Sequence, residues 1–239
     1  MEQAADLQHR YDKILDNIVS TATRCGRDHA DIRLVAVSKK QPIEKIAAYI
    51  LAGGTILGEN YPEEGAEKKQ ALASLKAEWH MVGHIQSRKA ALVAQHYDFI
   101  HSLDSLKLAD KLNNALGEQN KRLPFLLEIN IGAEANKSGY LIHTDMELEK
   151  LWLDLDRIIL LSNLNWRGIM IMPPFSLIAE ESRSYFIQAR EFLATLQNRY
   201  PTLPLDQLSM GTSLDYMPAI EEGATMVRIG TALFGERKY

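Results

Sequence analysis

The sequence predicts an α/β fold: one (β/α)8 barrel of the triosephosphate isomerase (TIM) type, preceded by an extra N-terminal helix. The chain has 239 residues, a length that such a barrel fills as one domain. Short apolar runs alternate with helical stretches, which is the pattern of a parallel sheet. There are about eight of these runs, so a closed barrel is favoured over a doubly wound open sheet.

The extra helix is predicted over residues 3–25. Apolar side chains recur there at the spacing of one helical face. They are Leu7, Tyr11, Ile14, Leu15, Ile18 and Val19. Since the last apolar run is followed by no clear helix, we expect the N-terminal helix to cover the gap that the missing helix would leave.

The strands are predicted where short apolar runs lie between helical stretches. In chain order they are Ile32–Ser38, Thr55–Gly58, Trp79–Gly83, Phe99–Leu103, Phe125–Ile131, Trp166–Met172, Gln207–Met210 and Met226–Ile229. The helix after the second strand contains "EEGAEKKQ", residues 63–70, which is typical of a solvated helical face. No Pro/Gly-rich linker divides the chain, so we expect a single domain over residues 1–239.

Composition excludes several classes of protein. The net charge of −4 and the pI near 6.0 provide no basic field for nucleic acid. The single cysteine, Cys25, cannot form an internal disulfide, and the polar N-terminus has no apolar signal core. No apolar run reaches the roughly 20 residues of a membrane helix. We therefore expect a cytoplasmic protein without nucleic-acid or membrane partners, and a monomer, because a small closed barrel can stand alone.

Two lysines, Lys39 and Lys40, end the first predicted strand, where a barrel carries its working groups. Side chains alternate along a strand, so only one of the two lysines can point into the barrel. Ala36 and Ser38 are small and suit packing against an outer helix, which leaves Lys39 on the inner face with Val35. Two solvated lysines at a strand end are the alternative.

Small residues follow the last two strands, where barrels of this type often bind phosphate. The segment "SMGTSLDY" passes through Gly211 into a predicted helix, and Thr212 and Asp215 have the spacing of a capping box. Backbone N–H groups at such a helix start favour an anion. Gly230 and Thr231 end the eighth strand beside this loop. The two loops together predict a phosphate site.

A lysine amine facing a phosphate site indicates imine chemistry, either with pyridoxal 5′-phosphate (PLP) or with a sugar-phosphate carbonyl, as in class I aldolases. The sequence has neither a Walker lysine loop nor a carboxylate cluster. His80 and His84, if both lie on the third strand, are about 13 Å apart and cannot share one metal ion. We therefore predict no metal site.

Arg228 lies within the apolar strand "MVRIG". A buried guanidinium can only donate hydrogen bonds, so it needs an acceptor. The nitrogen of an unprotonated pyridine ring is such an acceptor, which favours PLP. A buried salt bridge of Arg228 to Glu59 or Asp215 is the alternative.

The chain resembles the YggS/PROSC family of PLP-binding proteins, which is related in fold to the N-terminal barrel of alanine racemase. The resemblance extends over nearly the whole chain, through "LVAVSKKQP", "LGENYPEEG", "EWHMVGHIQSRKA", "IHSLDSLKLADKL", "NKSG", "RGIMIMPP", "LSMGTSLDY" and "GATMVRIGTALFG". The loop "GENYPEE" departs from the usual "GENYVQE" at Pro62 and Glu63, and Lys40 replaces a common threonine.

The resemblance implies a role for each candidate residue. It assigns the PLP aldimine to Lys39 and the ring-nitrogen contact to Arg228, and it makes Asn60 a pocket residue. The implied phosphate contacts are Ser209, Gly211, Thr212, Ser213, Gly230 and Thr231. Lys137 and His80 are possible secondary residues. Lys137 could compete for the PLP aldehyde or receive it during transfer, and a solvated loop lysine is the alternative. His80 could be a ligand or a catalytic group, and a hydrogen-bonded core residue is the alternative.

The implied function is PLP (vitamin B6) and amino-acid homeostasis by a carrier or regulator without an established reaction, with PLP-dependent apoenzymes as possible partners. The chain ends nine residues after Gly230, which leaves no room for the second domain that supplies the racemase tyrosine. We therefore expect one face of PLP to be open to solvent. A single-domain amino acid racemase or decarboxylase is the first alternative, and a class I aldolase is the second.

Overall fold

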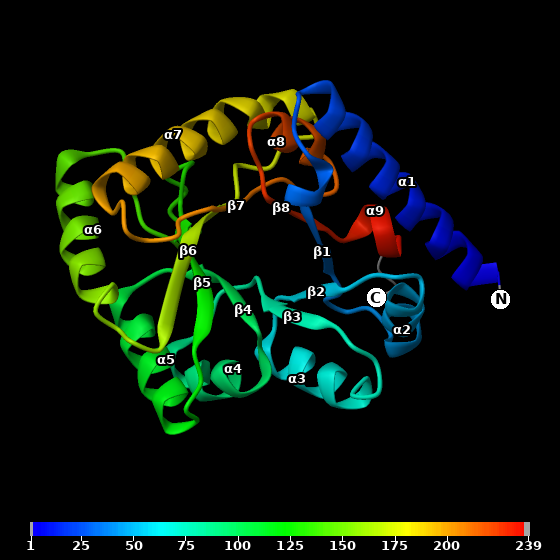
Figure 1. The fold of residues 1–239 in the computed structure, drawn as a ribbon, viewed down its shortest axis with the longest axis horizontal. Coiled ribbons are helices and arrows are strands. Elements are labelled where there is room, and N and C mark those ends of the chain that lie inside the picture. The colour runs from blue at the N-terminus through cyan, green and yellow to red at the C-terminus, as the bar shows by residue number, and fades with distance from the viewer. Residues whose placement is uncertain (1, 237–239) are drawn as a thin grey trace.

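The computed structural model describes residues 2–236 and forms a closed barrel of parallel strands (Figure 1). The strands pair in chain order, and β8 pairs with β1 to close the ring. They are β1 (Arg33–Val37), β2 (Ile56–Glu59), β3 (Glu78–Met81), β4 (Phe99–Leu103), β5 (Leu123–Ile129), β6 (Leu164–Ile171), β7 (Gln207–Ser209) and β8 (Met226–Ile229). The predicted fold class and each of the eight predicted strands are confirmed.

Helices cover the outside of the barrel (Figure 1). They are α1 (Glu2–Arg24), α2 (Ile43–Leu51), α3 (Pro62–Ala71), α4 (Ala90–His96), α5 (Leu106–Glu118), α6 (Asp145–Ile158), α7 (Arg183–Arg199), α8 (Tyr216–Glu221) and α9 (Thr231–Phe234). Short 3-10 segments are η1 (His29–Asp31), η2 (Ser87–Lys89) and η3 (Ala179–Ser182). None of the helices within residues 2–236 has the length and apolarity needed to cross a bilayer.

The extra N-terminal helix, α1, closes the ring of helices between α8 and α2 (Figure 1). Leu7, Ile14 and Ile18 bury its inner face. The expectation that no helix follows the last strand was wrong, because the four-residue α9 follows β8 directly. A helix of four residues is too short to produce a helical apolar period, which explains why the sequence pattern did not reveal α9. The longer α1 packs against α9 and covers it.

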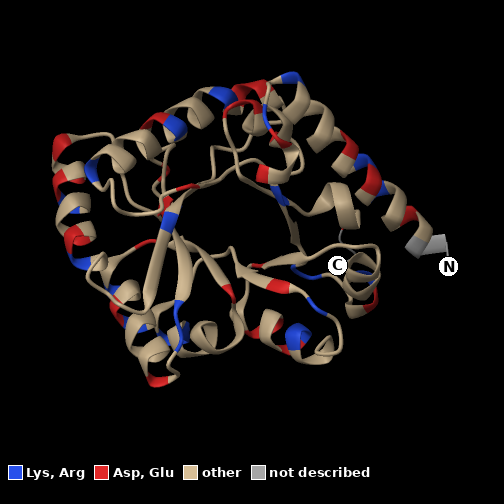
Figure 2. Cartoon of the chain, viewed as in Figure 1, with Lys and Arg blue, Asp and Glu red and all other residues tan. Residues whose placement is uncertain are grey.

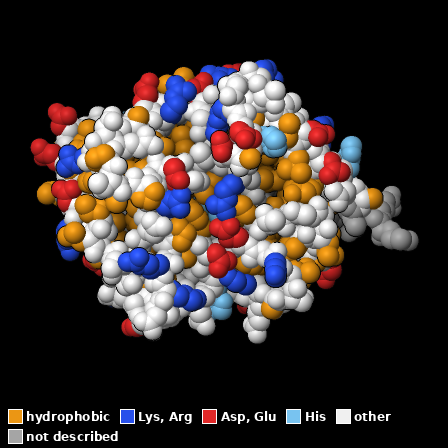
Figure 3. Space-filling view, in the orientation of Figure 1, with side chains coloured by type: hydrophobic (Ala, Val, Ile, Leu, Met, Phe, Trp, Pro, Cys, Tyr) orange, Lys and Arg blue, Asp and Glu red, His pale blue; other side chains and the backbone are white. Residues whose placement is uncertain are grey.

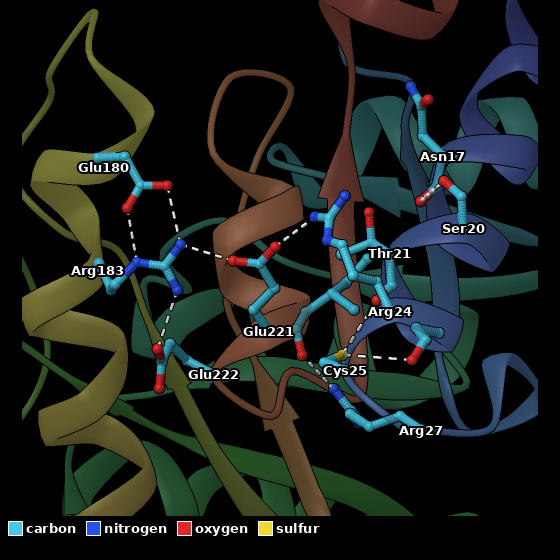
Figure 4. A network of polar contacts seen from close by, with 12 residues as sticks. Asn17, Ser20, Thr21, Arg24, Cys25, Arg27, Glu180, Arg183, Glu221 and Glu222 are labelled. Atoms are coloured by element: carbon cyan, nitrogen blue, oxygen red, sulfur yellow. Dashed lines mark hydrogen bonds and ion pairs between the residues drawn. The ribbon is translucent and has the colours of Figure 1, made fainter.

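An ion-pair network joins the C-terminal end of α1 to α8 and to the start of α7 (Figure 4). Arg183 donates to Glu180, Glu221 and Glu222, and Arg24 approaches Glu221 from the other side. The Arg183–Glu221 distance is 2.6 Å. Because several charges share partners, this surface network is worth more than an isolated pair.

The core of the protein consists of two apolar clusters, one inside the barrel and one between the strands and the surrounding helices. The inner cluster contains Val35, Ile56, Phe99, Leu126, Met170 and Met226. The larger outer cluster, which includes Ala36, lies between the strands and the helices. Figure 2 shows charged residues mainly on the helices, while the strands are mostly uncharged. The alternation predicted for β1 is confirmed, since Val35 points inward and Ala36 outward.

On the face shown in Figure 3, basic and acidic side chains lie next to one another at the centre. Mixed charge of this kind produces no strong field of one sign over that face. It agrees with the small net charge of the chain, −4.

Candidate functional site

A cavity of about 510 Å³ lies at the carboxyl ends of the strands. This is the end of the barrel at which such folds carry their working groups. Its wall contains polar residues from several strand ends, together with apolar side chains from the loops. The lining residues are Val37, Lys39, Asn60, Val82, Gly83, His84, Glu128, Met170, Met172, Phe175, Thr212, Ser213, Leu214, Arg228, Gly230, Thr231 and Ala232.

Lys39 enters the cavity from a tight turn after β1. The turn is closed by the Gln41 N–H, which donates to the Ser38 carbonyl at 3.0 Å. Lys40 occupies the left-handed region with φ 57°, an uncommon conformation for a residue with a side chain. The turn directs Lys39 into the cavity and leaves Lys40 exposed.

Lys68 of α3 holds this turn from outside the barrel. Its buried ammonium donates to the Ser38 carbonyl at 2.6 Å, and to Glu59 and Glu64 at 2.7 Å each. Glu64 in turn accepts the Lys40 N–H at 2.5 Å. The three donors of one ammonium therefore fix both sides of the turn that carries Lys39. The interpretation of residues 63–70 as a solvated face was wrong for Lys68.

Glu59 lies beneath the turn and is fully buried. Its Oε1 accepts from Lys68 and from the Ser38 hydroxyl at 2.6 Å, while Oε2 has no partner. Burial raises the pKa of Glu59, and the Lys68 charge opposes that rise. The salt bridge considered for Glu59 therefore exists, with Lys68 as the partner in place of Arg228.

Arg228 lines the cavity from β8 and is 5% exposed. Its Nη1 donates to the Ser209 hydroxyl at 2.7 Å, and its Nη2 donates to the Ile171 carbonyl at 2.9 Å. Burial lowers the pKa of Arg228 to about 10, so the guanidinium is still charged at neutral pH. Neutral acceptors hold this cation, while Asp215 and Glu128 act on it only through their charge.

The loops after β7 and β8 meet at Ser213. The Ser213 Oγ accepts from the N–H groups of Gly230 and Ala232 at 3.2 Å each. Two backbone donors at the start of α9 thus already stabilise one oxygen atom, which is the donor chemistry that an anion requires. Gly211 has φ 87°, and a Cβ there would lie 2.6 Å from the Ala219 Cβ. Only glycine fits this bend.

The capping box predicted at Thr212 and Asp215 is formed only in part. The Asp215 carboxylate accepts from the Thr212 N–H at 2.6 Å and from its hydroxyl at 2.9 Å. The bond from the Thr212 N–H is one half of a capping box. The other half is absent, because the Thr212 hydroxyl donates to Asp215 and does not accept from the Asp215 N–H, and α8 begins only at Tyr216. The physical reason is that a carboxylate competes well for local N–H donors and pulls the loop into a turn. The N–H of Thr212 is therefore already used within the loop.

Most of the predicted site residues lie around the same cavity. Those that line it are Lys39, Asn60, Thr212, Ser213, Arg228, Gly230 and Thr231. Ser209 and Gly211 are outside the lining: Ser209 supports Arg228 from behind, and the Gly211 carbonyl accepts the Arg228 N–H at 3.0 Å. Direct phosphate contacts had been predicted for both residues, whereas the structure places them behind the residues that line the cavity.

The two secondary candidates lie outside the cavity lining. Lys137 donates to the carbonyls of Met172 and Pro173 and pairs with Glu134, so its amine is held at the loop after β6. His80 is fully buried in the barrel and is hydrogen-bonded on both ring nitrogens. Its place agrees with the core alternative given above.

Sequence reasoning missed Glu128 and the part that His84 plays in the cavity wall. Glu128 Oε2 is buried without a partner, and burial and Asp104 raise the pKa of this carboxyl to about 7. His84 lies beyond the end of β3 and contacts Asp104 at 2.9 Å. The signal for Glu128 was available: it follows the inward-pointing Leu126 by two residues in "LLEINIG".

Comparisons with known proteins agree on one family. The profile of the family described as alanine racemase, N-terminal domain, matches residues 10–238. Two relatives named pyridoxal phosphate homeostasis protein are similar over nearly their whole length. The protein of Vibrio alginolyticus is 39% identical over 239 residues, 98% of this chain and 99% of the relative. That of Escherichia coli K12 is 41% identical over 242 residues, 98% of each.

Solved structures give the same result. PipY of Synechococcus elongatus PCC7942, solved with PLP bound, superposes with a TM-score of 0.79 at 35% identity, covering 91% of this chain and all of PipY. Alanine racemase of Clostridium difficile 630 superposes with a TM-score of 0.73 at 15% identity, covering 98% of this chain and 57% of the racemase. This second likeness concerns the fold alone.

Proposed function

The chain belongs to the family of the alanine racemase N-terminal domain, and from that premise we propose that it binds PLP in the cavity at the carboxyl ends of the strands. We further propose that it serves PLP and amino-acid homeostasis as a carrier or regulator of PLP. The names of its relatives and the PLP bound to PipY support this proposal. The observation that carries it is the meeting of Lys39, Arg228 and the Ser213 loop around one cavity.

The chemistry of the cavity wall fits the three polar groups of PLP. PLP supplies an aldehyde that reacts reversibly with primary amines. The Lys39 amine is the group that would hold this aldehyde. Arg228 can only donate, and the pyridine nitrogen is an acceptor that fits it. Ser213, Gly230 and Thr231 would hold the phosphate, and Asn60 would complete the wall.

The remaining residues orient these groups. Lys68 fixes the turn that carries Lys39, and Ser209 fixes one side of the Arg228 guanidinium. Because Arg228 cannot accept a proton at neutral pH, it keeps a hydrogen-bonded pyridine nitrogen unprotonated. A ring without this proton is a weaker electron sink, which suits storage and transfer of PLP better than amino-acid chemistry.

The anchor can be tested by absorbance and peptide mapping. The purified protein loaded with PLP should absorb visible light, and borohydride reduction should fix the pyridoxyl group on Lys39. Lys39→Ala should abolish this labelling, while Lys40→Ala is the matched control, because Lys40 is exposed beside the same turn. Labelling of the Lys39→Ala protein at the same site would refute Lys39 as the anchor.

Glu128 favours a second candidate function, that of an amino acid racemase or decarboxylase. A carboxyl with a pKa of about 7 on the cavity wall is suited to exchange a proton near neutral pH. Release of α-deuterium from a panel of labelled amino acids distinguishes the two functions. Release well above the rate with free PLP, and lost in Glu128→Gln, would favour the enzyme. Release at the rate of free PLP would favour the carrier.

A further inference from the structure

A continuous chain of hydrogen bonds runs through the inside of the barrel. His80 Nε2 contacts Glu78 Oε1 at 2.8 Å, and His80 Nδ1 contacts His101 Nε2 at 2.8 Å. His101 Nδ1 contacts the Ser209 hydroxyl at 2.9 Å, and Ser209 accepts from Arg228 at 2.7 Å. This series of hydrogen bonds therefore joins strands β3, β4, β7 and β8 and ends at the cavity wall.

The chain crosses a region that barrels normally fill with aliphatic side chains. His80 and His101 are fully buried, and Phe99 stacks on His80 at 4.9 Å between ring centroids. Ser209 is also fully buried. Burying this many polar atoms is costly unless each has a partner, and here each ring nitrogen has one.

The other end of the hydrogen-bond series, Glu78, lies at the opposite mouth of the barrel. Glu78 is the first residue of β3, and its side chain is 36% exposed. Arg33, the first residue of β1, donates to Glu78 from the same rim. Burial opposes ionisation of Glu78, but the hydrogen bonds from His80 and Arg33 and the Arg33 charge outweigh it and lower the pKa of Glu78, so this carboxylate is ionised and can only accept.

Burial favours the neutral forms of both histidines. Burial lowers the pKa of His80, and Arg33 adds to this, although Glu78 and Asp98 act in the opposite direction. Burial also lowers the pKa of His101 to well below its usual value, and the charges of Arg228 and Arg33 act in the same direction. Both rings are therefore neutral at pH 7.

Neutral rings leave one arrangement of protons. Since Glu78 only accepts, His80 must carry its proton on Nε2, and its Nδ1 is then an acceptor. His101 must therefore carry its proton on Nε2, which makes its own Nδ1 an acceptor. The Ser209 hydroxyl must donate to that nitrogen, and its oxygen accepts from Arg228. Every donor in the chain points away from the cavity, toward Glu78.

We propose that Glu78, His80, His101 and Ser209 form a one-way hydrogen-bonded relay that positions the Arg228 guanidinium at the cavity wall and connects it with the opposite mouth of the barrel. Ser209 is a better acceptor because its own hydrogen is donated onward, and hydrogen bonds in such chains polarise one another. His80 and His101 are thus positioning residues for Arg228. The PLP-dependent part of the test below rests on the proposed function.

The proton arrangement can be tested on the protein without PLP. Long-range ¹H–¹⁵N correlation spectra of histidine-labelled protein at pH 7.5 should show both His80 and His101 as neutral rings protonated on Nε2. Assignment follows from the loss of each signal in single variants. A charged ring, or a proton on Nδ1 of either residue, would overturn the relay. This measurement does not depend on PLP binding.

The positioning of Arg228 can be tested with two substitutions of His101. Asn at this position places an acceptor where Nδ1 lies but cannot reach His80, whereas Leu removes both contacts. We expect His101→Leu to accelerate hydrogen exchange at Arg228 Nε and to weaken PLP binding about tenfold, the scale of one charge-assisted hydrogen bond. His101→Asn should lie between His101→Leu and the wild type, and His96→Asn on α4 is the control.

The outcomes separate the relay from ordinary core packing. A fall in melting temperature in both variants, with unchanged Arg228 exchange and unchanged PLP affinity, would assign His101 to packing and overturn the proposal. Equal effects of Asn and Leu would also overturn it. Failure of wild-type protein to bind PLP would refute the proposed function instead, and the spectra and the Arg228 exchange rates would still judge the relay.

Discussion

Replacing Lys68 with methionine should destabilise the protein strongly and in a pH-dependent way. Methionine keeps most of the aliphatic length but removes the three donors that reach Ser38, Glu59 and Glu64. Glu59 would then be a buried carboxylate without its cation. Removing one partner of a buried ion pair costs about 3–5 kcal/mol. For a chain of this size, that corresponds to a fall in melting temperature of about 6–20 °C.

The pH dependence follows from Glu59. Its pKa is already raised by burial, and the loss of Lys68 raises it further. The folded state then binds a proton more tightly than the unfolded state, so stability falls as the pH rises through the pKa of the folded form. The destabilisation by Lys68→Met should therefore be larger at pH 8 than at pH 5, because protonation of Glu59 removes the unpaired buried charge.

The assay is urea unfolding of the protein without PLP at pH 5 and pH 8. Lys69→Met is the matched control, because Lys69 is the next residue of α3 and forms a partly exposed pair with Asp98. It should cost no more than about 1 kcal/mol. Adding Glu59→Gln to Lys68→Met should restore stability at pH 8. A loss that is equal at both pH values, or a double variant less stable than Lys68→Met, would refute the reasoning.

Three further predictions concern the cavity wall and the bend at Gly211 that supports it. Arg228→Ala should shift the absorbance of bound PLP and weaken its binding, with Arg228→Lys intermediate; unchanged spectra and affinity would refute the ring contact. Gly211→Ala should lower the free energy of unfolding by more than about 1 kcal/mol, measured by urea unfolding, because φ is 87° and the new Cβ would lie 2.6 Å from Ala219. Glu128→Gln should stabilise the PLP-free protein at pH 8 by up to about 3 kcal/mol and by little at pH 4.5, since a pKa raised to about 7 makes folding less favourable as the pH rises. Thermal unfolding across that range checks the last prediction, and a pH-independent difference would contradict it.

The fold followed from sequence because its determinants are local and repeated. Strand β4 was predicted with the bounds Phe99–Leu103 that the structure shows, and β8 with the bounds Met226–Ile229. The predicted start of β5, by contrast, was two residues late at Phe125, because Leu123 and Pro124 look like loop residues by composition. Strand ends depend on pairing with neighbours, which a single run of residues does not reveal.

The candidate site was only partly predictable for a related reason. The inward direction of Lys39 was predicted from alternation along one strand, a property of a few consecutive residues, although the structure directs Lys39 into the cavity through the turn after β1. The burial of Lys68 depends on the fit of α3 against β2 and against the turn after β1, and a lysine in "EEGAEKKQ" gives no sign of it. The link between His80 and His101 likewise needs the register of β3 against β4. Contacts between distant segments are therefore the part that sequence patterns leave open.

Two groups of the cavity wall, Lys39 and Arg228, are held by separate layers of the barrel. Lys39 depends on a charged network outside the strands, in which Lys68 joins the turn to α3. Arg228 depends on the hydrogen-bonded relay inside the barrel, which begins at Ser209 and passes through two buried histidines. Since the two supports share no residue, a change in one layer need not disturb the other. Under the proposed function, the PLP anchor could therefore stay rigid while the ring contact is tuned independently, as a carrier of PLP would require.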